Sequence, residues 1–211
     1  MSTGSELQIK GIRLFESGKY DEAAETFAAA IAAYREEGNE QLASEMRVNL
    51  GLARRELGDY ETAVAEMQGG LSHFQQSGDK LHEAQTFGNM ALAYLRAENH
   101  EQAETMYREA ARLFREIGED DYYGETILAL GDMLFRSGKL LEALAIFEIG
   151  LDHIKEKSQR QKVMKQLLVL KNRISGEQRA GENPSNTAPV SDRRRRRFLQ
   201  RQSSNGEPDG Q

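Results

Sequence analysis

A pattern of small and aromatic residues recurs every 40 residues along most of this chain. In one copy, the turn Gly58-Asp59-Tyr60 precedes Ala63, and the matching turns begin at residues 18, 98 and 138. A fixed period in this range indicates an array of structural repeats. In such an array, each unit buries its apolar face against its neighbours instead of forming a core of its own.

Each 40-residue unit contains two stretches with apolar residues at helical spacing, separated by a glycine or a polar turn. All three prolines lie at or beyond Pro184, so no proline interrupts a helix before that point. Thr3 and Glu6 form a capping-box pattern that starts the first helix. Residue 98 is Glu98 instead of glycine, and we expect Asn99 to take the left-handed conformation there. The predicted helices span about 5–17, 20–37, 40–57, 60–77, 80–97, 100–117, 120–137 and 140–156.

Small residues recur at one position of each helix. The first helix of each unit carries Gly11, Gly51, Ala91 and Gly131, and the second carries Ala23, Ala63, Ala103 and Ala143. A glycine inside a helix costs about 0.5–1 kcal/mol relative to alanine. Its recurrence therefore predicts that the two helices of a unit approach closely at this position.

The small residue, the Gly-Asp-Tyr turn, the alanine and the following large residue together resemble the tetratricopeptide repeat family. The resemblance covers residues 5–156, and the 40-residue unit is similar to the longer repeats of kinesin light chains and bacterial Rap-type regulators. It implies an all-α, right-handed superhelical solenoid of four helix-turn-helix repeats within residues 1–156. The expected repeats are about 5–37, 40–77, 80–117 and 120–156.

Residues 157–175 predict a further amphipathic helix, with Val163, Leu167, Leu170 and Ile174 on one stripe and lysines and arginines opposite. One interpretation is a capping helix that covers the end of the array. The other is a basic amphipathic helix for a membrane surface or a partner protein. Residues 176–211 are rich in polar residues and glycine and are expected to form a disordered tail.

Charge divides the chain in two. Residues 1–154 contain 14 Lys/Arg and 28 Asp/Glu, a net charge of −14, whereas residues 155–211 contain 14 Lys/Arg and 6 Asp/Glu, a net charge of +8. The tail includes Arg193, Arg194, Arg195, Arg196, Arg197 and Arg201. This run is open to several interpretations: contact with nucleic acid or anionic lipid, a nuclear import signal, docking on the acidic repeats, or a solvated tail without a dedicated role.

The sequence offers no recognisable catalytic chemistry. It contains no cysteine, no phosphate-binding glycine loop and no pair of histidines at metal-ligand spacing. No signal peptide and no apolar stretch of 18 residues is present, and we expect a cytoplasmic protein. These observations predict a protein that is not an enzyme and needs no cofactor or metal.

The resemblance also implies a concave groove lined by the first helix of each repeat. Its expected apolar residues are Ile12, Val48, Leu52, Leu92, Leu95, Leu128 and Phe135. Its expected polar residues are Glu45, Asn49, Arg55, Gln85, Asn89, Arg96, Glu125, Asp132 and Arg136. Asn49 and Asn89 occupy the same repeat position, where a side-chain amide offers both a donor and an acceptor to a ligand backbone.

We therefore predict a noncatalytic scaffold or adaptor that binds a peptide or a partner helix in the groove. The alternative is a nucleic-acid-associated regulator, in which the basic C-terminal region contacts nucleic acid and the repeats recruit a partner. The oligomeric state is not predicted by the sequence.

Overall fold

The computed structural model describes residues 3–154, 161, 162, 164–166, 168 and 169, and the described part is helical apart from short turns. The helices are α1 (Gly4–Glu16), α2 (Tyr20–Glu36), α3 (Glu40–Glu56), α4 (Tyr60–Ser77), α5 (Lys80–Arg96), α6 (His100–Glu116), α7 (Asp120–Arg136) and α8 (Leu140–His153). The predicted boundaries agree with these to within one residue, except at the end of α8.

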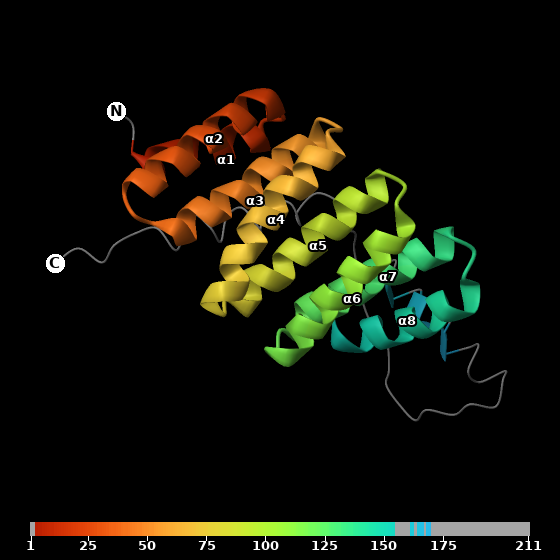
Figure 1. Cartoon of the computed structure of the whole chain (residues 1–211). Helices are drawn as coiled ribbons and strands as arrows, with labels where there is room; N and C mark the ends of the chain where they lie inside the picture. The colour runs from red at the N-terminus through yellow and green to blue at the C-terminus, as the bar shows by residue number, and fades with distance from the viewer. Residues whose placement is uncertain (1–2, 155–160, 163, 167, 170–211) are drawn as a thin grey trace.

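The helices stack in the order of the sequence. Each one packs against the helix before it and the helix after it (Figure 1). Because only two or three residues separate successive helices, neighbours run antiparallel and form the pairs α1–α2, α3–α4, α5–α6 and α7–α8. This arrangement confirms the predicted all-α solenoid.

The turns between helices depend on one left-handed residue each. Gly58 has a φ of 85° and Gly138 a φ of 80°, which a glycine adopts without steric cost. The prediction for the third repeat was wrong by one residue: Glu98 takes the left-handed conformation, with a φ of 59°. Asn99 has a φ of −87° and caps α6, because its Oδ1 accepts a hydrogen bond from the Gln102 backbone N–H at 3.2 Å. The left-handed residue therefore keeps its position in the 40-residue repeat, at 98, although asparagine at 99 adopts that conformation more readily than glutamate does.

The start of the array is fixed by the predicted capping box. The Glu6 backbone N–H donates to Thr3 Oγ1 at 3.2 Å, and the Thr3 backbone N–H donates to Glu6 Oε2 at 3.1 Å. Both bonds satisfy backbone donors that have no partner inside the helix. A cap of this kind stabilises a helix by about 1 kcal/mol.

The small residues allow the close approach that the sequence predicts. A Cβ atom added to Gly51 would lie 2.7 Å from the Ala63 carbonyl oxygen of α4, and one added to Gly11 would lie 2.6 Å from the Phe27 ring of α2. Neither space can hold a methyl group, so glycine is required at both positions.

A second small position was missed at the sequence level. A Cβ atom on Gly4 would lie 2.5 Å from the Tyr34 ring, and one on Gly124 would lie 2.8 Å from Ile154 Cγ1. Tyr34 and Ile154 occupy the same repeat position at the end of the second helix of their units. In the first and fourth repeats, the start of the first helix is therefore packed under the large side chain that ends the second.

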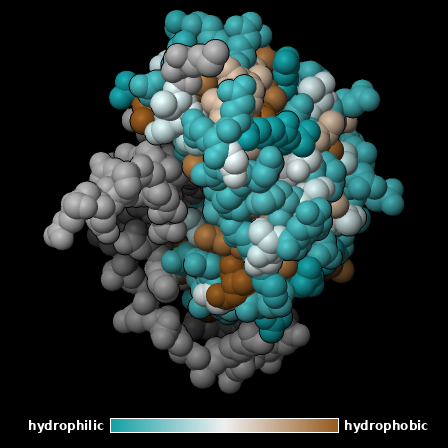
Figure 2. Space-filling model, turned by 60° about the vertical axis from the view of Figure 1, so that its left-hand side comes forward, coloured by the Kyte–Doolittle hydropathy of each residue, from teal (hydrophilic) through white to brown (hydrophobic). Residues whose placement is uncertain are grey.

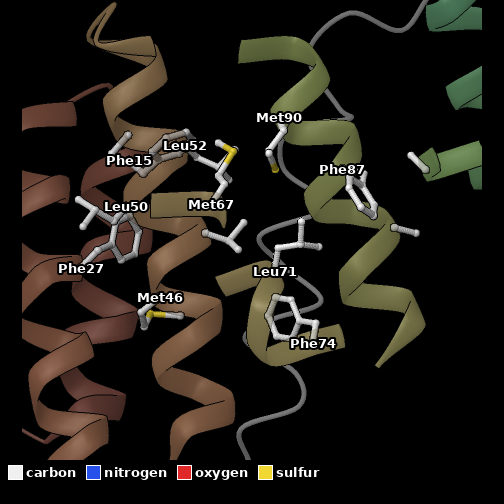
Figure 3. Close-up of a cluster of buried hydrophobic side chains, with 14 of the residues drawn as sticks. Phe15, Phe27, Met46, Leu50, Leu52, Met67, Leu71, Phe74, Phe87 and Met90 are labelled. Carbon is white, nitrogen blue, oxygen red and sulfur yellow. The ribbon is translucent and has the colours of Figure 1, made fainter. Parts of the chain in front are cut away.

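Between the helix pairs, the buried apolar side chains form two clusters, a large one that extends from α1 to α7 and a smaller one at the C-terminal end of the array. Figure 3 shows Phe27 of α2 beside Leu50 of α3, and Leu71 of α4 directed toward α5. Phe27 and Leu71 are both fully buried. Burying an apolar side chain of this size stabilises the fold by about 1.5–3 kcal/mol, so these layers hold consecutive repeats together.

The C-terminal end of the array departs from the prediction in one respect. Helix α8 ends at His153, because Ile154 has an extended backbone with a ψ of 121°. The described residues between 161 and 169 are helical, and Leu168 is buried against the core of the last two repeats, with Met164 beside it. Most of residues 157–175 lie outside the described ranges, so the capping interpretation of this segment stays a prediction.

Candidate functional site

The odd-numbered helices form the inner layer of the array. Among helices α1 to α8, α3 contacts α5 directly, whereas no two even-numbered helices make a comparable contact. In a curved double layer, the helices on the inner side lie closer together than those on the outer side. The residues that α1, α3, α5 and α7 direct away from the even-numbered helices therefore line the concave face.

On α3, the predicted groove residues are buried. Asn49 is 0% exposed, and Leu52 and Arg55 are also buried. Val48 and Glu45 on the same helix are buried as well, as is Ile12 on α1. The α3 part of the concave face is therefore not accessible to a ligand in this structure.

On α5, the corresponding residues reach the surface. Leu92, one repeat after Leu52, is 39% exposed, and Arg96 is also exposed. Gln85 and Asn89 are partly buried and lie about two turns and one turn, respectively, before Leu92 on the same helix. Four predicted residues are thus brought together along one helix.

On α7, the predicted residues lie in the middle and at the end of the helix. Phe135 is 54% exposed, which is a large exposure for an aromatic side chain. Asp132 and Arg136 form an ion pair, with Arg136 Nε 3.1 Å from Asp132 Oδ2. Glu125 and Leu128, nearer the start of α7, are partly buried, as is Leu95 on α5. We refer to Gln85, Asn89, Leu92, Arg96, Asp132, Phe135 and Arg136 as the concave α5–α7 surface.

On the face drawn in Figure 2, most of the described residues are hydrophilic, and apolar side chains gather in small patches. Figure 2 shows one such patch, in brown, in the lower half of the view.

Three charged side chains join the α3 and α5 parts of the groove. Glu56 accepts hydrogen bonds from Arg55 Nη2 at 3.0 Å and from Arg96 Nη1 at 3.2 Å. The Glu56 and Arg55 side chains are both buried. This pairing fixes the direction of the Arg96 side chain at the edge of the concave α5–α7 surface.

A polar cluster near the start of α3 and α5 was not predicted. Gln41 Nε2 donates to Glu45 Oε1 at 3.3 Å and to Asp79 Oδ2 at 3.0 Å, and His82 Nδ1 lies 2.7 Å from the same Asp79 oxygen. Its only sequence signal is the capping position of Asp79, three residues before His82. The cluster joins the second and third repeats.

The carboxylates of this cluster have opposite pKa shifts. Burial raises the pKa of Glu45 above its ordinary value, against the attraction of His82 and the hydrogen bond from Gln41. Burial also acts to raise the pKa of Asp79. The hydrogen bonds from His82 and Gln41 and the attraction of His82 act in the other direction and are stronger together, so the pKa of Asp79 is lowered below its ordinary value. Since these interactions lie within the fold, we assign the cluster a structural role.

The described residues show no feature of a metal site or a membrane span. No group of three or more histidine or acidic residues among them could hold a metal ion. None of the helices in the described ranges is long and apolar enough to cross a membrane. The basic residues Arg193 to Arg197 and Arg201 lie outside the described part of the chain.

Comparison with known proteins identifies the repeats. The family model described as a tetratricopeptide repeat matches residues 42–116 and 82–156, which together make up more than half of the chain. The chain belongs to the tetratricopeptide repeat family. Tetratricopeptide repeats are modules for protein–protein interaction, and this general role applies to the repeats described above.

Two solved tetratricopeptide-like structures resemble the whole array. BtubC (BKLC) from P. vanneervenii has a TM-score of 0.66 at 12% identity, over 88% of this chain and 85% of that chain. The putative kinesin light chain repeats from Podosopora anserina have a TM-score of 0.65 at 13% identity, over 97% of this chain and 96% of that chain. At this identity the likeness concerns the fold. A search of curated protein sequences found no match.

Proposed function

We propose that this tetratricopeptide repeat protein is a noncatalytic scaffold that binds a peptide segment or a partner helix on the concave α5–α7 surface. The observation that carries the proposal is the exposure of two large apolar side chains, Leu92 and Phe135, on the inner layer of the array. An apolar anchor in a partner gains about 1.5–3 kcal/mol when it is buried against such residues.

Polar groups beside these anchors supply the specificity. Asn89 lies one turn before Leu92 and is partly buried. Its side-chain amide offers two donors and an acceptor, which suits the backbone of an extended peptide. Arg96, Asp132 and Arg136 provide charges around the apolar anchors, where they set orientation and partner choice more than affinity.

We propose a supporting role, not direct contact with a partner, for the groove residues that the sequence predicts on α3. Asn49, Leu52 and Arg55 are buried, so we assign them to the support of the surface and not to its first contact with a partner. An Asn49→Ala variant would change packing as well as binding. Asn89→Ala tests the same amide at an accessible position.

A peptide-display selection tests the proposal directly. Peptides selected on the wild-type chain are measured for affinity to Leu92→Lys and to a control, Thr105→Lys, on the exposed outer face of α6. We expect Leu92→Lys to weaken binding about tenfold or more and Thr105→Lys to leave it unchanged. Equal affinity for the two variants, with both still folded, would rule out the concave α5–α7 surface.

The proposal places the scaffold in the cytoplasm. Fractionation of cells that express the protein from its own gene, followed by detection with a specific antibody, tests this placement. Recovery in the soluble cytoplasmic fraction would support it, and recovery with membranes or in the medium would contradict it.

A further inference from the structure

Gly88, in the middle of α5, has no side chain where the other repeats have one. The matching residues are Gln8, Val48 and Leu128. A glycine inside a helix lowers its stability relative to alanine, and a packing or functional requirement is the usual reason to find one there. For every other glycine within α1 to α8, packing is that reason, because an added Cβ atom would lie within 3.0 Å of a neighbouring atom. No atom of the described residues lies within 4 Å of the Cβ position of Gly88.

The missing side chain leaves a hollow beside α5. In the second repeat, the side chain at this position packs over a glycine of the paired helix, since a Cβ atom on Gly70 would lie 2.9 Å from Val48 Cγ2. The fourth repeat has the same arrangement with a leucine. In the third repeat, Ala110 takes the place of the glycine opposite Gly88. Its methyl group does not reach the Cβ position of Gly88, so the space that valine or leucine fills elsewhere stays open.

This hollow belongs to the concave α5–α7 surface. Gln85 lies three residues before Gly88 and Leu92 four residues after it, so both are its neighbours on the surface of the helix. Gly88, Gln85 and Asn89 are partly buried, and Leu92 is exposed. A ligand that contacts these side chains therefore also reaches the helix backbone at Gly88.

Two side chains beside the hollow have hydrogen-bonding groups to offer. Within the described part of the chain, the side-chain amides of Gln85 and Asn89 make no hydrogen bond. In contrast, the amide of Gln41 on α3 donates to two carboxylates. Gln85 and Asn89 are four residues apart, so their amides are separated by about 6 Å along the axis of α5. Each amide provides donors and an acceptor on one side of the hollow.

We infer that the hollow receives the main chain of an extended peptide, and that Gly88 is the residue that determines this specificity. The inference rests on the proposed function and names the kind of ligand for the same surface. In an extended chain, the N–H and C=O of one residue point to the same side, and those of the next residue but one do so again about 6.6 Å further on. This distance matches the separation of the two amides, so each can accept from the N–H and donate to the C=O of one peptide residue.

A partner helix fits this arrangement less well. Its backbone N–H and C=O groups bond to one another inside the helix, so Gln85 and Asn89 would find no backbone group to bind. Its main chain also lies at the centre of a cylinder about 10–12 Å across, behind its own side chains. An extended main chain, in contrast, can lie directly against α5, provided that residue 88 has no side chain to hold it away.

Gly88→Ala tests the inference, because stability and binding should change in opposite directions. The added methyl group has space in the free protein and favours the helix, so the melting temperature should rise by about 1–4 °C. The affinity for peptides selected on the wild-type chain should fall about fivefold or more. Gly88→Leu, which introduces the leucine of the fourth repeat, should weaken binding further. A more stable Gly88→Ala variant with unchanged affinity would overturn the role of Gly88.

Comparison with Leu92→Lys separates this inference from the proposed function. If Leu92→Lys weakens binding and Gly88→Ala does not, the concave α5–α7 surface binds the peptide and Gly88 has no part in its specificity. If neither variant changes the affinity, the proposed function and the inference both fail. Thr105→Ala, on the exposed outer face of α6, is the control for substitution by alanine and should leave the affinity unchanged.

N-methylation of a selected peptide tests the extended main chain. Each backbone nitrogen of the peptide is methylated in turn, which removes one hydrogen-bond donor at a time. We expect the affinity to fall about fivefold or more at two nitrogens that are two residues apart. The loss should be smaller in a variant that combines Gln85→Ala with Asn89→Ala. Losses at consecutive nitrogens, as a helical ligand would show, or equal losses in the wild type and the double variant, would contradict the inference.

Discussion

Arg96 Nη1 lies 3.2 Å from Glu56 Oε2, and the two residues occupy the same position in consecutive repeats, 40 residues apart. Glu56 is buried and also pairs with the buried Arg55, whereas Arg96 is exposed. The pair joins the inner helices α3 and α5 at the edge of the concave surface. It is thus one of the contacts that set the angle between the second and third repeats.

The two sides of this pair should contribute unequally to stability. Arg96→Ala removes an exposed partner and should lower the free energy of unfolding by less than about 1 kcal/mol. Glu56→Ala removes the carboxylate that compensates buried Arg55, and should lower it by about 3 kcal/mol. Chemical denaturation of both variants measures the difference. Equal losses would show that Arg55 does not depend on Glu56.

The turn between α5 and α6 offers a stabilising substitution. Glu98 has a φ of 59°, which costs a residue with a side chain about 1 kcal/mol relative to glycine. We expect Glu98→Gly to raise the free energy of unfolding by about 0.5–1 kcal/mol.

The second repeat provides the matched control for this turn. Gly58→Glu places a side chain at the same turn position, where φ is 85°, and should lower stability by about 1 kcal/mol or more. Thermal melts of both variants check the prediction. A loss of stability in Glu98→Gly would show that the glutamate side chain has a role that outweighs the backbone strain.

Stability should fall at alkaline pH through a buried tyrosine. Burial raises the pKa of Tyr107 from 10.0 to about 12, ahead of smaller and opposing effects of Arg55 and Asp132. The unfolded chain therefore loses this proton near pH 10, while the folded chain retains it until about pH 12. Stability is complete below pH 10 and decreases above it by up to about 1.4 kcal/mol per pH unit from this group.

Tyr107→Phe removes this titration. Measured by denaturation between pH 9 and pH 11, at about half-unit steps, the variant should show a shallower loss of stability than the wild type. An identical pH dependence in the two proteins would show that Tyr107 titrates normally in the folded state.

The alternative function makes its own prediction at the basic tail. If the run Arg193 to Arg197 with Arg201 contacts nucleic acid, the full chain should bind a duplex at low salt. The logarithm of the affinity should then fall with a slope of roughly −5 against the logarithm of salt concentration. Deletion of residues 193–201 should remove this binding and leave peptide binding unchanged. If the full chain does not bind the duplex at low salt, the nucleic-acid-associated function is ruled out.

The 40-residue period was enough to predict the helices, because each turn carries its own local signal. Gly58 and the capping box of Thr3 act through the backbone nearby, and both are found as expected. The error at Asn99 arose because a residue preference was given more weight than the register of the repeat. The register places Glu98 at the left-handed position.

The candidate site could be predicted only in part. The sequence places Asn49 and Asn89 at the same repeat position, but it does not show that the first is fully buried and the second partly accessible. The contact of Gln41 with Asp79 likewise joins residues that are 38 positions apart. Such contacts depend on the angle between consecutive repeats. The spacing of apolar residues within one helix does not determine this angle.

NMR mapping of a selected peptide is the most direct test of the concave α5–α7 surface as the binding site. A peptide obtained on the wild-type chain is titrated into isotope-labelled protein, and backbone shifts are followed. The account predicts the largest changes at Gln85, Asn89, Leu92 and Phe135, and little change at Thr105 on the outer face. Changes confined to the outer faces of α4, α6 and α8, with the inner helices unaffected, would contradict it.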